Sequence, residues 1–361
     1  MRDILPICSR AGVTRLGDLT GLDHLGIPVA QAVRPVALSE VTSLGRGKTL
    51  QQAAIGALME AMERVYAEAV PPGRVFVATA QELGIAEGAF DTLALPERKR
   101  DWRSVETAWV LGLDVAGGTE IPVPLELVHA CYTEPPLPHD GLFHRTTTGL
   151  ACHRTVHEAF LHGLFECLER DALARAFATH GFFDRMRLAA ERLDGDVGTW
   201  LSISAEHGIA AAFWSAPSPT GVPVVWCQTI ETGSEAPLLS LPTEGYAAAP
   251  TLPQAMANAL LEALVTRAAV ISGARDDLTA THYSRARADI VATARQLILD
   301  AGKTESSGLQ EIPAVQCASD IVERVTVVGL GAVIAVPVGS DRGIHCVRTV
   351  LSAALPLAVV R

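Results

Sequence analysis

The sequence predicts an α+β fold with mostly antiparallel sheets, and three observations support this prediction. Segments rich in Ala, Leu, Glu and Met, such as 51–69 and 157–176, favour helix. Short strand-like runs lie between the helical segments without the regular βαβ spacing of a doubly wound sheet. Three of the helical segments repeat one pattern, which predicts a threefold-repeated, helix-bearing unit.

The expected strands are short, apolar and often β-branched. In chain order we expect them at 4–7, 75–80, 107–115, 121–128, 222–230, 325–338 and 344–351. Two segments rich in Pro, Gly and Ser, 133–141 and 233–251, are predicted to be loops that lead into the second and third helical copies.

The helical copies share the pattern T-x-x-x-A-x-x-x-x-L-x-E-x-x-E-R. Two copies, at 49–64 and 155–170, match it without a gap. The third copy, at 251–265, keeps Glu262 but has Val265 where the second carboxylate would stand. The repeat predicts three helices that occupy related places in the fold.

Each E-x-x-E places two carboxylates on one face of a helix, with Cβ atoms about 5–6 Å apart. The pairs are Glu60 with Glu63 and Glu166 with Glu169, and apolar residues surround both. Either each pair is a solvated stripe balanced by the following Arg, or a cation lies between the carboxylates. Because the motif occurs twice in apolar surroundings, we favour a shared divalent-metal or nucleotide site, with Mg²⁺ as the preferred ion.

Composition narrows the class of protein. The net charge of −11 argues against a general nucleic-acid binder, which would present a basic face. The chain contains no long uncharged apolar run and no signal-peptide pattern, so we expect a cytoplasmic protein without a membrane span. The 7 cysteines are scattered and contain no C-x-x-C, which argues against a disulfide framework or a cysteine zinc site. His153 and His157 are spaced like a helical zinc pair but have no convincing third ligand.

Basic residues near the helical copies suggest anion binding. The segment SLGRGKT at 43–49 lacks the first glycine of a P-loop, but its glycines, Arg46 and Lys48 precede a helix start. It is either a phosphate-binding turn or a plain glycine turn. Arg267 and Arg275 follow the third copy and either bind an anion or form surface ion pairs.

Five stretches together resemble the YcaO family. They are DLTGLDHLGIPVAQAVRP (18–35), SLGRGKTLQQAAIGALMEAMERVYAE (43–68), VPLELVH (123–129), TGLACHRTVHEAFLHGLFECLERDAL (148–173) and GARDDL (273–278). The resemblance implies a single YcaO domain over 1–361 that uses ATP and Mg²⁺ to phosphorylate the oxygen of a peptide amide. A nucleophile then attacks the activated carbon, which gives an azoline, a thioamide or an amidine in a ribosomally made peptide.

The resemblance also assigns residues. It makes Glu60, Glu63, Glu166 and Glu169 the carboxylates that hold magnesium and triphosphate, with Glu166 and Arg170 also catalytic. Further nucleotide contacts are expected at Glu158, Arg170, Arg46, Arg267 and Arg275.

The chain departs from the family pattern at several positions. From the resemblance we expect that the Lys- and Ser-bearing nucleotide segment, which usually precedes the DLTGLD motif, is missing. The segment 147–155 reads TTGLACHRT where relatives often read SNGLASGNT. Because both carboxylate pairs are intact, we expect nucleotide use. The altered segment favours an azoline or a macrocyclic amidine as the product, as in stand-alone bottromycin-type members. TfuA-assisted thioamidation and a non-catalytic peptide-binding subunit are the alternatives. The expected partners are a precursor peptide, a separate TfuA-like or leader-binding protein and a second copy in a homodimer.

Overall fold

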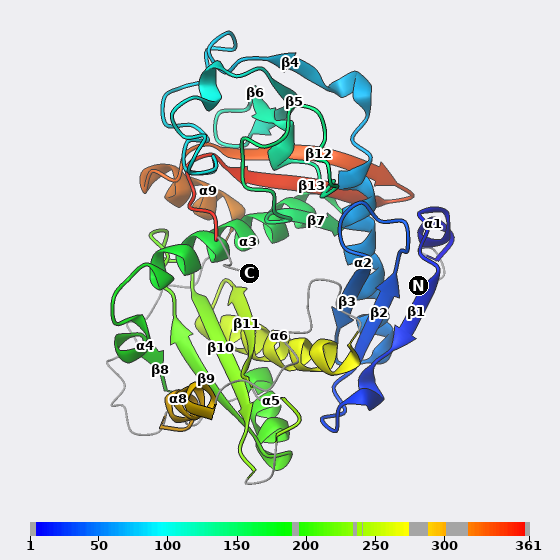
Figure 1. Cartoon of the computed structure of the whole chain (residues 1–361), viewed down its shortest axis with the longest axis vertical. Helices are drawn as coiled ribbons and strands as arrows, with labels where there is room; N and C mark the ends of the chain where they lie inside the picture. The colour runs from blue at the N-terminus through cyan, green and yellow to red at the C-terminus, as the bar shows by residue number, and fades with distance from the viewer. Residues whose placement is uncertain are drawn as a thin grey trace.

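The computed structural model describes residues 5–189, 195–233, 237–239, 241–273, 288–300 and 317–357. Its strands form three sheets, and each sheet lies beside one long helix (Figure 1). Every strand pair in the described part of the chain is antiparallel, which confirms the predicted α+β class.

The first sheet has three strands and precedes the helix α2 (Leu50–Glu68). Its order is β1 (Arg15–Asp18), β2 (Val29–Val33) and β3 (Thr42–Arg46). The short helices α1 (Leu5–Arg10) and η1 (Thr20–Leu22) flank β1 in the chain. Helix α2 packs on β2 and β3, and its buried residues include its alanines, together with Leu58 and Met62.

The second sheet has six strands and packs against the helix α3 (Val156–Phe177). Its order is β4 (Phe76–Ala78), β5 (Thr107–Asp114), β12 (Val333–Asp341), β13 (Ile344–Leu351) and β7 (Leu150–His153), and β6 (Thr119–Pro124) pairs with β5. Short helices connect or flank these strands: η2 (Pro72–Arg74), η3 (Trp102–Ser104), η4 (Leu125–Leu127) and α9 (Ala318–Val327).

The third sheet has four strands and packs against the helix α6 (Leu252–Ser272). Its order is β11 (Thr243–Ala248), β10 (Val224–Glu231), β9 (Ile209–Ser215) and β8 (Arg187–Leu188). The remaining described helices are α4 (Phe182–Arg185), α5 (Gly195–Glu206) and α8 (Ala288–Leu299).

The three long helices begin where the sequence predicts. Thr49, Thr155 and Thr251 are extended N-cap residues, and each side chain accepts the backbone N–H three residues later. Each helix follows a strand at the edge of its own sheet, namely β3, β7 and β11. The wider threefold-repeated unit remains a prediction.

Glycines allow these edge strands to approach their helices closely. A Cβ atom on Gly45 of β3 would lie 1.9 Å from Ala53 O of α2, and one on Gly245 of β11 would lie 2.2 Å from Ala259 O of α6. No side chain fits at such distances, so glycine is required at both positions.

Three of the local predictions are wrong. Residues 5–10 form α1 rather than a strand, because the periodicity of so short an apolar run does not distinguish helix from strand. The segment 325–338 begins as the end of α9, and β12 starts only at Val333. The expected loop 233–251 contains β11, whose alternating small and polar residues gave a weak strand signal.

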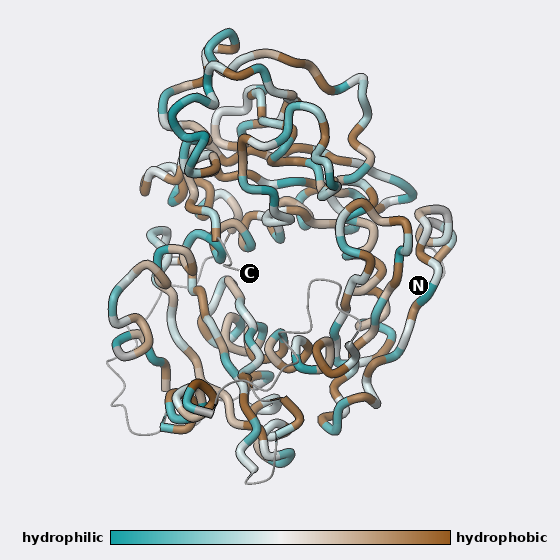
Figure 2. Tube along the Cα trace, in the orientation of Figure 1, coloured by the Kyte–Doolittle hydropathy of each residue, from teal (hydrophilic) through white to brown (hydrophobic). Residues whose placement is uncertain are grey.

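Helix α6 is apolar enough to resemble a membrane span by length and composition alone, with a mean hydropathy of 1.3 over its most apolar stretch. However, 61% of that stretch is buried inside the protein. Figure 2 shows hydrophobic residues recurring along its trace beside the third sheet. We therefore interpret α6 as the core helix of the third sheet.

Candidate functional site

The carboxylates of the first pair accept hydrogen bonds from two different sheets. Glu60 Oε2 accepts Leu44 N–H of β3 at 3.0 Å, and Glu63 Oε1 accepts Cys152 N–H of β7 at 2.9 Å. The first carboxylate therefore binds the strand that precedes its own helix, and the second binds the edge strand of the next sheet.

The second pair repeats this arrangement on α3. Glu166 Oε2 accepts Gly149 N–H, just before β7, at 2.9 Å. Glu169 Oε2 accepts Ala248 N–H of β11 at 3.1 Å. The shared spacing in the sequence thus corresponds to a shared hydrogen-bonding role.

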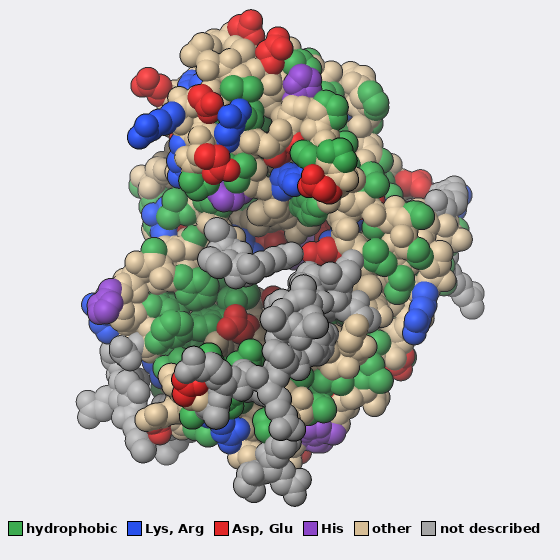
Figure 3. All heavy atoms as spheres, in the orientation of Figure 1, with side chains coloured by type: hydrophobic (Ala, Val, Ile, Leu, Met, Phe, Trp, Pro, Cys, Tyr) green, Lys and Arg blue, Asp and Glu red, His purple; other side chains and the backbone are tan. Residues whose placement is uncertain are grey.

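The third helix contributes one carboxylate, and it reaches back to the first sheet. Glu262 Oε2 lies 3.2 Å from Arg46 Nη2 of β3. The described residues therefore connect α2 to β7, α3 to β11 and α6 to β3 through polar side chains. Figure 3 shows acidic side chains on the wall of a hollow at the centre of this face.

The carboxylates form a continuous row of like charges. Burial raises the pKa of Glu60, and it raises that of Glu63 well above its ordinary value, with Glu60 and Glu166 adding to the shift at Glu63. Burial raises the pKa of Glu169 to about 7, and the charges of Glu262 and Glu166 add to this effect. Glu63 and Glu166 are therefore close enough to repel each other, although they belong to different helices.

Arg170 lies against the second pair. Its Nη2 is 3.7 Å from Glu166 Oε1 and 3.5 Å from Glu169 Oε1, and its guanidinium lies over the ring of Tyr246 at 5.7 Å. Burial acts to lower the pKa of Arg170, but the nearby carboxylates raise it, so this side chain is charged. Both ion-pair distances are longer than a good charge-assisted hydrogen bond, which leaves the guanidinium able to bind another anion.

Arg64 takes the equivalent place on α2, but it is held more tightly. Its Nη2 is 2.7 Å from Glu40 Oε2 and 3.0 Å from Glu60 Oε1. Arg64 is 7% exposed, and its guanidinium bridges two carboxylates. Arg64 therefore fixes Glu60 through Nη2, whereas its Nε and Nη1 are buried without a hydrogen-bond partner.

The donor set fits Mg²⁺ bound together with phosphate. Each carboxylate accepts a backbone N–H on one oxygen, which fixes its orientation, and the second oxygen of Glu60 also accepts Arg64 Nη2. As they stand, no three His, Cys, Asp or Glu side chains in the described part of the chain form a metal-binding group. Mg²⁺ usually takes only one or two carboxylates and completes its shell with phosphate oxygens and water. Paired carboxylates beside an arginine meet that requirement.

The structure places the other predicted contacts as follows. The Thr155 hydroxyl accepts a hydrogen bond from Glu158 N–H and donates one to Glu158 Oε2, so Glu158 bonds the N-cap residue of α3. Arg267 is 3% exposed and pairs with Asp23 at 2.9 Å and with Glu231 at 2.6 Å. Arg275 lies outside the described residues. The nucleotide roles of these side chains remain predictions.

Sequence reasoning missed Glu40 and Tyr246 as members of the site. Neither belongs to the repeated motif, and each is brought to an arginine only by tertiary packing. Glu262 was visible in the third copy, but nothing local indicated that it would pair with Arg46, 216 residues away.

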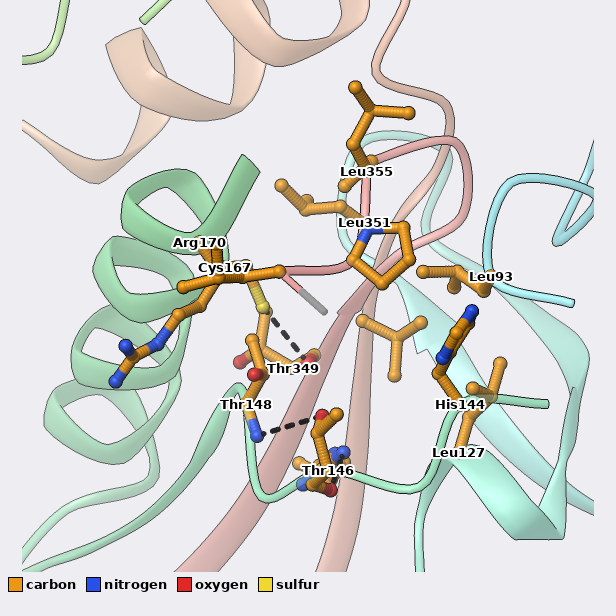
Figure 4. Close-up of a pocket in the computed structure, with 15 residues that line it drawn as sticks. Leu93, Leu127, His144, Thr146, Thr148, Cys167, Arg170, Thr349, Leu351 and Leu355 are labelled. Atoms are coloured by element: carbon orange, nitrogen blue, oxygen red, sulfur yellow. Dashed lines mark hydrogen bonds between the residues drawn. The ribbon is translucent and has the colours of Figure 1, made fainter. Parts of the chain in front are cut away.

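A small pocket with a cavity volume of about 50 Å³ adjoins Arg170. Its walls come from α3, from the loop before β7, from β13 and from the segment that follows β13. Figure 4 shows Cys167 and Arg170 on α3, with Leu351 and Leu355 facing them. The guanidinium of Arg170 extends away from these leucines in Figure 4, and its Nη2 lies near Glu166 and Glu169.

Residues 44–353 match the family model described as YcaO cyclodehydratase, ATP- and Mg²⁺-binding. An uncharacterized protein of Methanothermobacter thermautotrophicus is 33% identical over 281 residues, which cover 77% of this chain and 71% of that protein. A protein of Rhizobium leguminosarum bv. trifolii, described as an uncharacterized protein in the tfuA 3′ region, is 30% identical over 290 residues. These residues cover 76% of this chain and 66% of that protein.

Two solved structures share the fold. The YcaO of Methanopyrus kandleri, bound with AMPPCP and Mg²⁺, has a TM-score of 0.67 at 23% identity, and the match covers 96% of this chain and 87% of that one. A heterocyclase in complex with substrate and cofactor has a TM-score of 0.72 at 18% identity. The match covers 95% of this chain and 50% of the heterocyclase chain.

Proposed function

The chain belongs to the YcaO family of ATP- and Mg²⁺-binding cyclodehydratases, and from this premise we propose that it activates a backbone amide of a ribosomally made peptide. The row of carboxylates beside Arg170 carries the proposal. Two helices present matched pairs whose pKa values are raised at Glu60, Glu63 and Glu169. Such a row is unfavourable without cations, and Mg²⁺ supplies the missing charge.

In this proposal the residues have distinct tasks. Glu60, Glu63, Glu166 and Glu169 hold Mg²⁺ and thereby orient the triphosphate. Arg170 binds phosphate oxygens, since its ion pairs are long enough to be exchanged for a ligand. When bound, Mg²⁺·ATP supplies the phosphoryl group that turns the amide oxygen into a leaving group. The remaining nucleotide contacts that we propose are Arg46, Glu158, Arg267 and Arg275.

We propose an azoline or a macrocyclic amidine as the product. In both cases a nucleophile of the peptide adds to the amide carbon, and the amide oxygen leaves with phosphate while ATP becomes ADP. The net change in the peptide is the loss of one water.

Peptide thioamidation with a TfuA-like partner is the second candidate. One observation favours it: the Rhizobium relative is described as lying in the tfuA 3′ region. Here an external sulfide replaces the amide oxygen, so the peptide exchanges oxygen for sulfur and loses no water. A non-catalytic peptide-binding subunit is the alternative from a different class.

The first test concerns the nucleotide. Mg²⁺·ATP should raise the melting temperature of the protein by mass action, and Glu166→Ala should abolish this shift. Glu323→Ala, at an exposed glutamate of α9, should preserve the shift and is the matched control. A folded wild-type protein without any shift would support the non-catalytic alternative.

The second test identifies the product. The protein is incubated with Mg²⁺·ATP and the precursor peptide encoded beside its gene, with and without a sulfide source and a TfuA-like protein. Mass spectrometry then distinguishes the loss of water from the exchange of oxygen for sulfur. The predicted homodimer and cytoplasmic location are proposals that size-exclusion chromatography and fractionation test separately.

A further inference from the structure

The pocket beside Arg170 contains a buried arginine with unsatisfied donors. Arg348 lies on β13 between Leu150 of β7 and Val336 of β12, and it is 3% exposed. Its Nη2 donates to Thr146 O at 2.7 Å, whereas its Nε and Nη1 are buried without a hydrogen-bond partner. In the part of the chain that the structure describes, no carboxylate pairs with it.

Two further donors near Arg348 lack partners. Arg145 lies with its guanidinium over the ring of Tyr132 at 6.0 Å, and both Arg145 Nη1 and the Tyr132 hydroxyl are buried and unsatisfied. Burial raises the pKa of Tyr132, and the charge of Glu40 adds to this effect, while the charges of Arg348, Arg64 and Arg145 act to lower it. Buried cations and hydroxyls that lack partners are unfavourable unless a ligand satisfies them.

Most of the other residues that line the pocket are aliphatic. This composition limits which ligand could supply a negative charge to Arg348. Apart from Arg348 and Arg170, the lining includes His144, three threonines, Cys167 and a majority of aliphatic residues. The aliphatic part consists of Leu93, Leu127, Val350, Leu351, Ala354, Leu355, Pro356 and Leu357. A ligand that satisfies both parts is an anion attached to an apolar group. A phosphate ion offers nothing to the leucines and would lose its hydration against them.

We propose that this pocket binds a carboxylate of the peptide substrate together with an adjacent apolar side chain, and that Arg348 holds the carboxylate. The proposal rests on the proposed function, because the pocket adjoins Arg170 of the nucleotide site. The cavity volume is about 50 Å³, so in this proposal only the carboxylate and part of the adjacent apolar side chain enter the pocket. Arg348 thereby becomes a specificity residue that selects peptides carrying a carboxylate beside an aliphatic residue.

The test uses four defined probes. N-acetyl-Leu-Leu carries a free terminal carboxylate, its C-terminal amide carries none, and N-acetyl-Glu-Leu-amide carries a carboxylate in a side chain. Inorganic phosphate is the fourth probe. Isothermal titration with wild-type protein should show that at least one carboxylate peptide binds about tenfold or more tightly than the amide, as expected for a charge-assisted contact. Whichever carboxylate peptide binds better identifies the source as the C-terminus or an acidic side chain.

Variants assign the contact to Arg348. Arg348→Met should lower the affinity for the preferred carboxylate peptide to that for the amide. Arg348→Lys keeps the charge and should retain part of the difference in affinity between the acid and the amide. Arg324→Met is the matched control, because Arg324 also donates to a backbone carbonyl, Thr220 O, but lies in a different pocket on α9. Both Met variants should keep the stabilisation by Mg²⁺·ATP.

Three outcomes would overturn the proposal: equal affinity for the acid and the amide, no effect of Arg348→Met on the acid, or Arg348-dependent binding of phosphate alone. The acid–amide comparison uses wild-type protein, so it decides the matter even where Arg348→Met fails to fold. A wild-type protein that binds the acid but shows no stabilisation by Mg²⁺·ATP would refute the proposed function and leave the carboxylate pocket intact.

Discussion

Arg170 and Arg175 lie on the same helix and show two uses of one side chain. Arg175 binds Asp171 through two hydrogen bonds, of 2.7 and 2.9 Å, and Asp171 is fully buried. Arg170 instead lies 3.5 and 3.7 Å from its two carboxylates, with its guanidinium over Tyr246. The first geometry belongs to a structural ion pair, whereas the second leaves donors for a ligand.

Arg170→Lys should therefore reduce turnover more than stability. Lysine keeps the charge but loses the planar fork, so we expect at least a tenfold loss of turnover, about 1.4 kcal/mol of transition-state stabilisation. The melting temperature should hardly change. Arg175→Lys is the control and should lower the melting temperature without changing activity per folded molecule. A structural role for Arg170 would give the reverse result.

The raised pKa of Glu169 predicts how stability depends on pH. The ordinary pKa of a glutamate carboxyl group is 4.5, whereas burial raises the pKa of Glu169 to about 7 in the folded state. The native state therefore binds more protons than the unfolded state across this interval, and its stability falls as pH rises. The charges that face Glu169 are Arg170, Glu166 and Glu262.

Glu169→Gln removes this titration and keeps an acceptor for Ala248 N–H. In metal-free buffer with EDTA, the melting temperature of the variant minus that of the wild type should grow as pH rises from about 5 to about 8, by on the order of a few degrees. Glu323→Gln should show a difference that does not depend on pH. A difference that shrinks with rising pH would contradict the predicted direction.

At the scale of the elements, the contact between edge strand and helix is the unit that builds the site. Gly45 of β3 allows α2 to approach until a Cβ atom would lie 2.1 Å from Ala57 N. This approach brings Leu44 N–H to Glu60. The glycine thus fixes the distance between a strand and a carboxylate as well as the packing of the helix.

Gly45→Ala should destabilise the protein by about 1–3 kcal/mol or more, because overpacking forces the strand and helix apart. Stabilisation by Mg²⁺·ATP should weaken as well, since Glu60 moves with α2. Gly73→Ala is the control, because no heavy atom lies within 4 Å of its added Cβ and its backbone is not in the left-handed region. Equal melting temperatures for the two variants would show that the contact between β3 and α2 tolerates a Cβ atom at position 45.

An element can be predicted from the sequence when the interactions that form it join residues close together in the chain. The starts of α2, α3 and α6 were predictable because a Thr N-cap bonds to a residue three positions away. The carboxylate pairs were predictable because helix geometry places residues three apart on one face. By contrast, the contacts of Glu63 with Cys152 and of Arg348 with Thr146 join distant segments. No local pattern encodes them.

At the scale of the whole molecule, the row of carboxylates connects elements of all three sheets. Glu63 of α2 bonds β7, Glu169 of α3 bonds β11, and Glu262 of α6 pairs with Arg46 of β3. A ligand that neutralises this row should therefore stabilise the helices together rather than singly.

Hydrogen exchange can test this coupling. Mg²⁺·ATP should slow amide exchange in peptides that span α2 and in peptides that span α3, and EDTA should reverse both effects. Peptides from α8, which contributes no residue to the row, should exchange at an unchanged rate and serve as the internal control. Protection of only one of the two helices would contradict a site shared between them.

The long sequence separations in the row also bear on the order of folding. Its contacts join residues 89, 79 and 216 positions apart, so the chain must close large loops before any of them forms. The helices and their Thr caps need only neighbouring residues and can form earlier. The repulsion between the carboxylates consequently arises late, after most of the chain is in place. Neutralising a member of the row should then slow unfolding more than it speeds folding, which makes the acidic centre a determinant of how long the folded protein survives.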